Sequence, residues 1–278
     1  MLRLLNIELQ KIRHNKAAKV ISIIYFVLIT FIAFIASIEF NFASVNFRLA
    51  DQGIFNFPFI WHFNTYVAAI LKFFLAVVIV SLIANEYSYR TLKQNLIDGL
   101  SKKEFILSKF LTVVLFAAVS TVFVFVVSLI LGLIFSDYNE FGIIFSGLEY
   151  LVAYFVKLIG FFSFCLFLGV LVKRSAFAIG FLFVWFVIES IIHAVLKFSI
   201  FKDSDISTTI MQFLPLESMS NLIKEPATRL GGVQSVANQL GEEFTKNYDV
   251  QLLSVAIVLV WTFLFIYWSH AILKKRDL

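Results

Sequence analysis

Four ionisable residues lie inside long apolar stretches of the sequence, where a charge is costly. Lys72 and Lys157 lie eight residues from one end of their stretches, Glu189 lies nine from the end of its own, and His193 follows Glu189 at the i, i+4 spacing of one helix face. A charge at the centre of a bilayer costs at least ~2.5–3.5 kcal/mol by insertion scales. If the stretches are membrane helices of alternating direction, a rise of ~1.5 Å per residue places all three charges at one level, ~12–13 Å from the same side.

Three interpretations of this intramembrane polar layer stay open. Glu189 could form a buried ion pair with Lys157 or Lys72 that fixes helix packing. The residues could instead form a polar patch on a substrate route, since ionisable residues inside membranes often mark such pathways. In the third interpretation the lysines snorkel to the outer interface and Glu189 is bound by backbone or water.

Catalytic and cofactor-binding motifs are missing from the sequence. No G-x-x-x-x-G-K-[ST] or G-x-G-x-x-G loop is present to cradle a phosphate, and no G-x-S-x-G presents a serine nucleophile. No H-E-x-x-H motif or Cys/His cluster has zinc-ligand spacing, and Cys165 is the only cysteine. We therefore expect a protein that is not an enzyme and has no catalytic, cofactor-binding or metal site of its own.

The elements that carry these residues are long enough to cross a membrane. Of the 278 residues 60% are hydrophobic and 15% charged, and the mean hydropathy is +0.92, whereas soluble domains are ~25% charged. A membrane helix needs ~20 mostly apolar residues. The fold class predicted is an all-α integral membrane protein of six transmembrane helices, uninterrupted by proline, over residues 18–38, 64–84, 110–135, 149–172, 176–198 and 250–273.

Basic residues predict the orientation of this single transmembrane domain, 1–278. Fifteen of the 23 Lys and Arg residues lie in the N-terminal segment, in 85–109, in 173–174 and in the C-terminal tail; six lie in the other connections. The positive-inside rule then places both termini and 85–109 in the cytoplasm and the long segment 199–249 outside. The net charge of +5 is explained by this topology and by contact with anionic membrane lipid, with no nucleic acid needed.

Apolar residues at helical spacing also occur outside the spans. Residues 1–17 are expected to form an amphipathic helix on the inner membrane surface, and two patterns in 199–249 predict short interfacial helices. The three patterns are Leu2/Leu5/Leu9/Ile12 opposite Arg3/Glu8/Lys11/Arg13, then Ile206/Ile210/Phe213/Leu214, and Val233/Val236/Leu240/Phe244.

The connection 85–109 has the most specific motif. It resembles the ABC-2 type permeases, in which the second span is followed by Glu, an Arg/Gly-Thr-Leu/Ile step, a leucine, Ser-Arg, and a Lys before the third span. Here Gly99-Leu100 stands where that family often has Thr-Pro, and Lys102 replaces the usual Arg. The most similar type is the single-chain permease of sodium- or bacitracin-efflux systems, which has no fused ATPase. The residues assigned to ATPase coupling are Glu86, Arg90, Thr91, Leu92, Leu96, Ser101, Lys102 and Lys109.

The resemblance implies both a function and partners. It implies the permease subunit of an ABC transporter in the cell's inner membrane, forming the pathway for ATP-driven export together with a second permease subunit, identical or related. ATP and Mg would bind to separate ABC ATPase subunits. A groove on the ATPase would receive the element 85–109 through an apolar stripe formed by Leu92 and Leu96.

Two other classes of protein stay open. A proton- or ion-coupled secondary transporter would use Lys72, Lys157, Glu189 and His193, and it predicts discontinuous helices or repeat symmetry, neither of which is visible in the sequence. A non-transporting membrane assembly protein would leave the motif in 85–109 without a role.

Overall fold

The computed structural model describes residues 2–42, 45–48, 53–201, 206–230, 233–234 and 247–276. This part of the chain is mostly helical, with one short hairpin in which β1 (Glu39–Phe42) pairs antiparallel with β2 (Val45–Arg48). The all-α prediction misses this hairpin, although both strands alternate polar and apolar residues with the period of two that favours extended structure.

Four described helices are long and apolar enough to cross a membrane: α6 (Lys102–Phe135), α8 (Glu149–Val172), α9 (Ser175–Val195, continued by a π-helix over Leu196–Ile200) and α13 (Leu252–Lys275). The number rises to six if two bent pairs each count as one span. These pairs are α1 (Leu2–His14) with α2 (Lys16–Ser37), bent by 89°, and α3 (Phe59–Ile70) with α4 (Lys72–Ser88), bent by 44°. The short helices are α5 (Thr91–Ile97), α7 (Phe141–Ile144), α10 (Ile206–Met211), α11 (Pro215–Ser220) and a 3-10 turn over Ala227–Arg229.

The second apolar stretch is broken, which corrects the expectation of an unbroken helix over 64–84. The break lies at Leu71, directly before Lys72. The Leu71 N–H donates to the Ala68 carbonyl at 3.1 Å, and the Phe74 N–H donates to the Leu71 carbonyl at 3.1 Å. These i→i−3 bonds tighten the helix locally, so the stretch bends without a proline.

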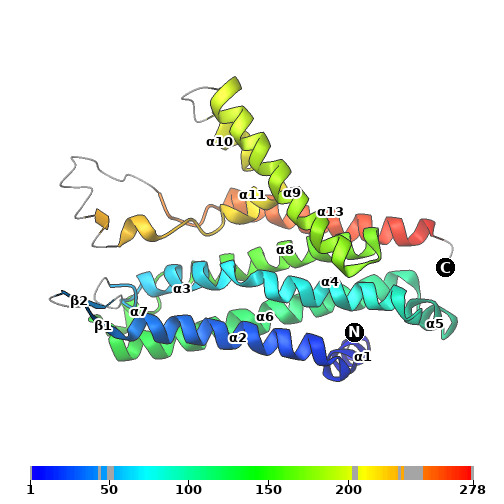
Figure 1. The fold of residues 1–278 in the computed structure, drawn as a ribbon, viewed down its shortest axis with the longest axis horizontal. Coiled ribbons are helices and arrows are strands. Elements are labelled where there is room, and N and C mark those ends of the chain that lie inside the picture. Colours follow the sequence, from blue (N-terminus) through cyan, green and yellow to red (C-terminus); the bar gives the residue numbers. More distant parts are fainter. Residues whose placement is uncertain are drawn as a thin grey trace.

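Helix α8 lies at the centre of the bundle and packs against α3, α4, α6, α9 and α13 (Figure 1). Two glycines allow its close contacts. A Cβ at Gly160 would lie 2.7 Å from Val258 Cγ1 of α13, and one at Gly169 would lie 3.1 Å from Ile83 Cβ of α4. Small residues at such contacts let helix backbones approach within the apolar medium.

Helix α9 leans away from the other long helices, and the segment after it turns back toward the bundle (Figure 1). There α11 contacts α8, α9 and α13, and Met219, Leu222 and Ile223 are buried. This part of 199–249, which lies between the two predicted amphipathic patterns, is therefore packed into the bundle. The pattern starting at Ile206 does coincide with α10. The pattern that begins at Val233 lies mostly outside the described residues.

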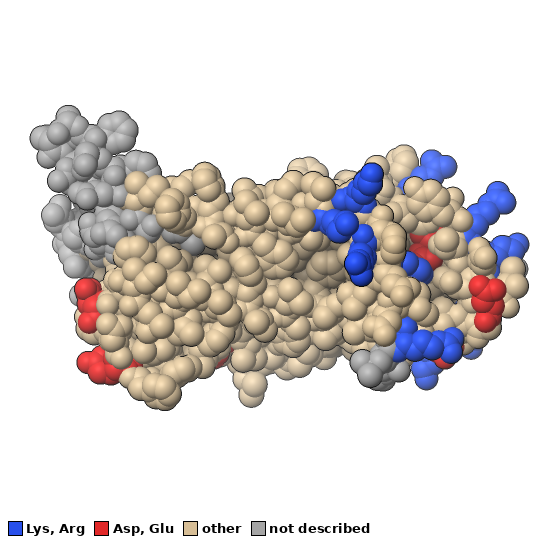
Figure 2. Space-filling view, turned by 90° about the horizontal axis from the view of Figure 1, so that it is seen from below, with Lys and Arg blue, Asp and Glu red and all other residues tan. Residues whose placement is uncertain are grey.

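One end of the bundle carries α1, α5 and the end of α13 (Figure 1). Lys and Arg side chains gather at this end in the space-filling view, which shares the horizontal axis of the first (Figure 2). We call it the basic end. At this end the start of α6 is joined to the segment after α13, since Lys102 Nζ donates to the Arg276 carbonyl at 2.8 Å.

Candidate functional site

A buried ion-pair cluster lies at the basic end and joins three helices. Lys109 Nζ of α6 lies 2.6 Å from Glu86 Oε1 of α4 and 2.7 Å from Glu8 Oε2 of α1. Lys11 Nζ lies 2.6 Å from the same Glu86 oxygen and 3.3 Å from Glu8 Oε1. The side chains of Glu8, Glu86 and Lys109 are only 2–3% exposed. Every charge in this ion-pair cluster therefore has an opposite charge beside it.

The position of Glu8 revises the predicted amphipathic helix. Glu8 is buried against α6, whereas Leu9 is 40% exposed, so the face turned to the protein carries a carboxylate. Burial by itself lowers the pKa of Lys11, but the carboxylates of Glu8 and Glu86 outweigh it and raise that pKa above its ordinary value. Lys11 thus stays charged, and α1 is fixed to the bundle by electrostatics as well as by apolar contact.

Helix α5 is attached to this ion-pair cluster at its first residue. Thr91 Oγ1 donates to Glu86 Oε2 at 2.6 Å. Arg90, which precedes it, is exposed and has the left-handed backbone conformation (φ 56°) that turns the chain from α4 into α5. The motif residues Glu86, Thr91 and Lys109 are therefore brought together in space at the start of α5.

The apolar stripe predicted to dock on a partner faces the bundle instead. Leu92 is 2% exposed and belongs to the core, and Leu96 is half-buried against it. The apolar side chains that α5 and its flanks present outward are Tyr89 and Ile97, each 74% exposed. The i, i+4 spacing of Leu92 and Leu96 predicts the apolar face of α5. It does not indicate that other parts of the same chain cover this face.

The remaining motif residues fix the start of α6. Ser101 Oγ accepts from the Glu104 N–H at 3.1 Å, and Glu104 Oε2 accepts from the Ser101 N–H at 2.9 Å, which forms a capping box. Lys102 binds the C-terminal carbonyls of α13 and its tail. Ser101 and Lys102 thus stabilise the second half of the connection.

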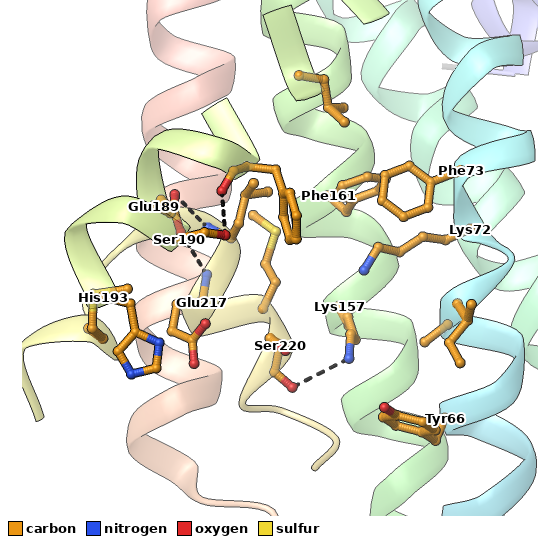
Figure 3. Close-up of a pocket in the computed structure, with 17 residues that line it drawn as sticks. Tyr66, Lys72, Phe73, Lys157, Phe161, Glu189, Ser190, His193, Glu217 and Ser220 are labelled. Atoms are coloured by element: carbon orange, nitrogen blue, oxygen red, sulfur yellow. Dashed lines mark hydrogen bonds between the residues drawn. The ribbon is translucent and has the colours of Figure 1, made fainter. Parts of the chain in front are cut away.

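The intramembrane polar residues line one cavity of about 280 Å³ between α3, α4, α8, α9 and α11. Figure 3 shows Lys72 and Lys157 on one wall, with Glu189, His193 and Glu217 across from them. Lys72, Lys157 and Glu189, for which helical rise predicts a common level, thus line the same cavity. Glu217 belongs to the segment that folds back, and the sequence contains no pattern that would have placed it there.

Glu189 does not form the predicted pair with either lysine. Its carboxylate accepts hydrogen bonds from Trp185 Nε1 at 2.6 Å, from the Leu216 N–H at 3.1 Å and from the Glu217 N–H at 3.0 Å. The two backbone groups belong to the first turn of α11, where a helix leaves its N–H groups unsatisfied. The packing pair is thus replaced by a carboxylate that attaches α11 to α9.

Neither lysine has a carboxylate in contact among the described residues. Lys157 is 4% exposed, and its Nζ donates to the Ser220 carbonyl at 3.4 Å. Lys72 Nζ lies 4.6 Å from the ring centre of Phe161, a cation–π contact. Among the described residues the ion pairs all belong to the cluster at the basic end. The same part of the chain holds no group of three His, Cys, Asp or Glu side chains suited to a metal ion.

Comparison with known proteins gives one family. Residues 4–215 match the family model described as ABC-2 family transporter protein, a match that runs from α1 to the first residue of α11. No curated protein matches the chain.

Proposed function

Because the chain belongs to the ABC-2 family of transporter proteins, we propose that it is the permease subunit of an ABC exporter driven by a separate ATPase. The observation that carries this proposal is the exposed apolar surface of α5 and its flanks, formed by Tyr89 and Ile97 at the basic end. Exposed aromatic and aliphatic side chains outside the membrane spans are candidate anchors of a protein interface. We call Tyr89 and Ile97 the α5 docking surface.

The ion-pair cluster gives this docking surface a rigid support. Thr91 connects α5 to Glu86 on α4. The ammonium group of Lys109 on α6 contacts both Glu86 and Glu8, and so joins α4 and α1 to α6. Breaking a buried ion pair by removing one member is costly, so the members move together. A displacement of α5 by a partner is therefore passed to α1, α4 and α6 as one unit.

The remaining assignments follow from orientation and family. The basic end would face the cytoplasm, in agreement with the positive-inside rule, and the protein would lie in the inner membrane. ATP and Mg would bind to ATPase subunits beneath it, and a second permease subunit, identical or related, would complete the pathway. Substrate would leave from the cytoplasm or the inner leaflet.

The test is co-purification with the ATPase. We expect the double variant Tyr89→Asp/Ile97→Asp to lower recovery of an ATPase with a Walker A motif about tenfold or more, because two charges would enter an apolar interface. The chain is purified from its native membrane in mild detergent, and the partner is identified and quantified by mass spectrometry.

A matched control uses the opposite end of the bundle. Tyr138 and Phe141 are 50% and 78% exposed near α7, so Tyr138→Asp/Phe141→Asp makes the same kind of change away from α5. Recovery should stay at the wild-type level in this control, and both variants should elute as monodisperse species. Equal recovery with the α5 variant would contradict docking on this surface.

A secondary carrier is a second candidate because the α3–α4 break lies next to Lys72. Broken helices often form the ion sites of such carriers. The chain reconstituted without an ATPase would then move substrate or protons down an imposed gradient. A permease that depends on an ATPase would show no such flux.

A further inference from the structure

The cavity between α3, α4, α8, α9 and α11 holds two lysine side chains with no ion-pair partner among the described residues. Lys72 and Lys157 both point into this space in Figure 3. Neither belongs to an ion pair among the described residues. Lys157 is buried and Lys72 is half-buried, and a buried lysine is normally paired, so a site that contains both is suited to a negatively charged ligand.

The carboxylates in the cavity do not supply this charge by contact. Both oxygens of Glu189 accept hydrogen bonds from Trp185 and from the backbone of α11. Glu217 forms no ion pair with a described lysine and lies on the wall opposite Lys72 and Lys157 (Figure 3). The remaining titratable group on that wall is His193. The space between the walls therefore offers donors from the lysine side and is open to a ligand.

The surroundings of the two lysines are apolar and partly open. Phe161 lies beneath Lys72, and the lining residues Ile70, Phe73 and Phe186 are 58%, 48% and 53% exposed. Ile70 and Phe73 belong to the bent pair α3–α4 and Phe186 belongs to α9, so in the proposed topology their exposed surfaces face lipid. A molecule can therefore reach the lysines from the bilayer while its apolar part stays on this rim.

The size of the cavity limits what enters it. About 280 Å³ is just below the ~300–1,000 Å³ of pockets that enclose drug-sized ligands. A phosphate or carboxylate head group fits this space, whereas a whole lipid does not. Lysine ammonium groups bind such oxygens with charge-assisted hydrogen bonds.

We propose that Lys72 and Lys157 bind the phosphate or carboxylate group of an anionic amphiphile whose apolar chain lies along Ile70, Phe73 and Phe186. As an assignment of substrate class this rests on the proposed export function. Binding of the amphiphile at this site needs no ATPase, so the binding site and the proposed export function can be disproved separately.

The test measures ligand-dependent thermal stability of the full purified chain in non-ionic detergent. The probes are phosphatidylglycerol, phosphatidylcholine and inorganic phosphate, since a ligand that binds only the folded state raises Tm. We expect phosphatidylglycerol to raise Tm more than phosphatidylcholine. We expect Lys72→Met/Lys157→Met to weaken this anionic-lipid effect about tenfold or more in apparent Kd.

The matched control removes two basic residues elsewhere. Lys16→Met/Lys19→Met changes two exposed lysines of α2 at the basic end, where anionic lipid can also bind. The phosphatidylglycerol effect should persist in this control. The single variants Lys72→Gln and Lys157→Gln, which keep one ammonium each, should show partial loss and provide the test if the double variant does not fold.

Each outcome decides the proposal. A lysine-dependent shift with phosphatidylglycerol but not with inorganic phosphate supports an amphiphile, whereas an equal shift with phosphate assigns the anion site to a free anion. An anionic-lipid effect that survives in the Lys72/Lys157 variants, or that is lost equally in the Lys16/Lys19 control, overturns the site. So does the absence of any lysine-dependent shift. Recovery of the ATPase, which tests the proposed function, is measured in a separate experiment, and none of these thermal-stability results depends on it.

Discussion

The ion-pair cluster at the basic end and the cavity between α3, α4, α8, α9 and α11 both contain lysines and glutamates, but within the described part of the chain only the cluster pairs them. In the ion-pair cluster Lys109 contacts both Glu8 and Glu86 within 2.7 Å. In the cavity Glu189 is bound by the first turn of α11, and Lys157 has one carbonyl contact at 3.4 Å. In the ion-pair cluster every charged side chain contacts an opposite charge, whereas in the cavity the lysines contact no described carboxylate. We call the first arrangement closed and the second open.

This difference separates support from ligand binding. A closed network leaves no donor for an outside molecule, and its removal destabilises the fold because charges are left without partners. An open set of charges contributes little to folding and is retained for what it contacts. The four predictions that follow test this distinction, beginning with the largest expected effect.

Lys109→Met should be the most destabilising change. It leaves Glu8 and Glu86 buried with only Lys11 beside them, and loss of one member of a buried ion pair costs about 3–5 kcal/mol. The measurement is the free energy of unfolding in mixed micelles, obtained from a denaturant titration. The control is Lys103→Met, an exposed lysine on the same helix. Equal effects of the two changes would show that the ion-pair cluster is not a support.

Glu189→Gln should have the next largest effect. A neutral amide accepts through one oxygen only, so at least one N–H of Leu216 or Glu217 loses its acceptor, at a cost of about 1–3 kcal/mol. Thermal stability should fall more than transport per folded molecule. The control is Glu140→Gln, an exposed residue whose side chain caps no helix. A loss of transport at unchanged stability would instead assign Glu189 to the pathway.

Thr91→Val should cost about 1 kcal/mol, since it removes one hydrogen bond to a charged acceptor that other groups still bind. Its effect on coupling should exceed its effect on stability, because Thr91 is the contact between α5 and Glu86. Two quantities are measured and compared: the ATPase activity of the co-purified complex and the unfolding midpoint of the chain. Thr30→Val removes only a bond within α2 and should change neither. Unchanged ATPase activity in the Thr91 variant would contradict the transfer of motion through this contact.

The long helices are predictable from the sequence because length and hydropathy determine them. Helix α8 has the bounds 149–172 that its apolar stretch indicates. The bend at Leu71 is not predictable in this way, since no proline or glycine marks it. The return of α11 into the bundle is also missed, because 199–249 is polar enough to favour the surface and sequence spacing does not indicate the hydrogen bonds of α11 to Glu189.

The candidate sites show a similar division. Depth along a helix is linear in residue number, so the common level of Lys72, Lys157 and Glu189 follows from the sequence. Which side chains touch depends on the rotation of each helix and on α11, and sequence spacing contains neither. Leu92 shows the same limit: its spacing identifies an apolar face, but packing against the core decides that this face is covered.

Lys157→Met should be the least destabilising of the four changes, with an effect that is neutral or opposite in sign to that of Lys109→Met. Both lysines are nearly inaccessible, 4% and 3% exposed, so burial alone would predict equal losses. Lys157 has no carboxylate in contact, and replacing an unpaired buried charge with an apolar side chain of similar length is neutral or stabilises by up to about 1–2 kcal/mol. The measurement is the same unfolding titration as for Lys109→Met, without anionic lipid. A loss comparable to that of Lys109→Met would mean that Lys157 already has a charge partner in the folded protein, such as Glu217. The cavity would then be closed like the ion-pair cluster, and no site for an anion would remain.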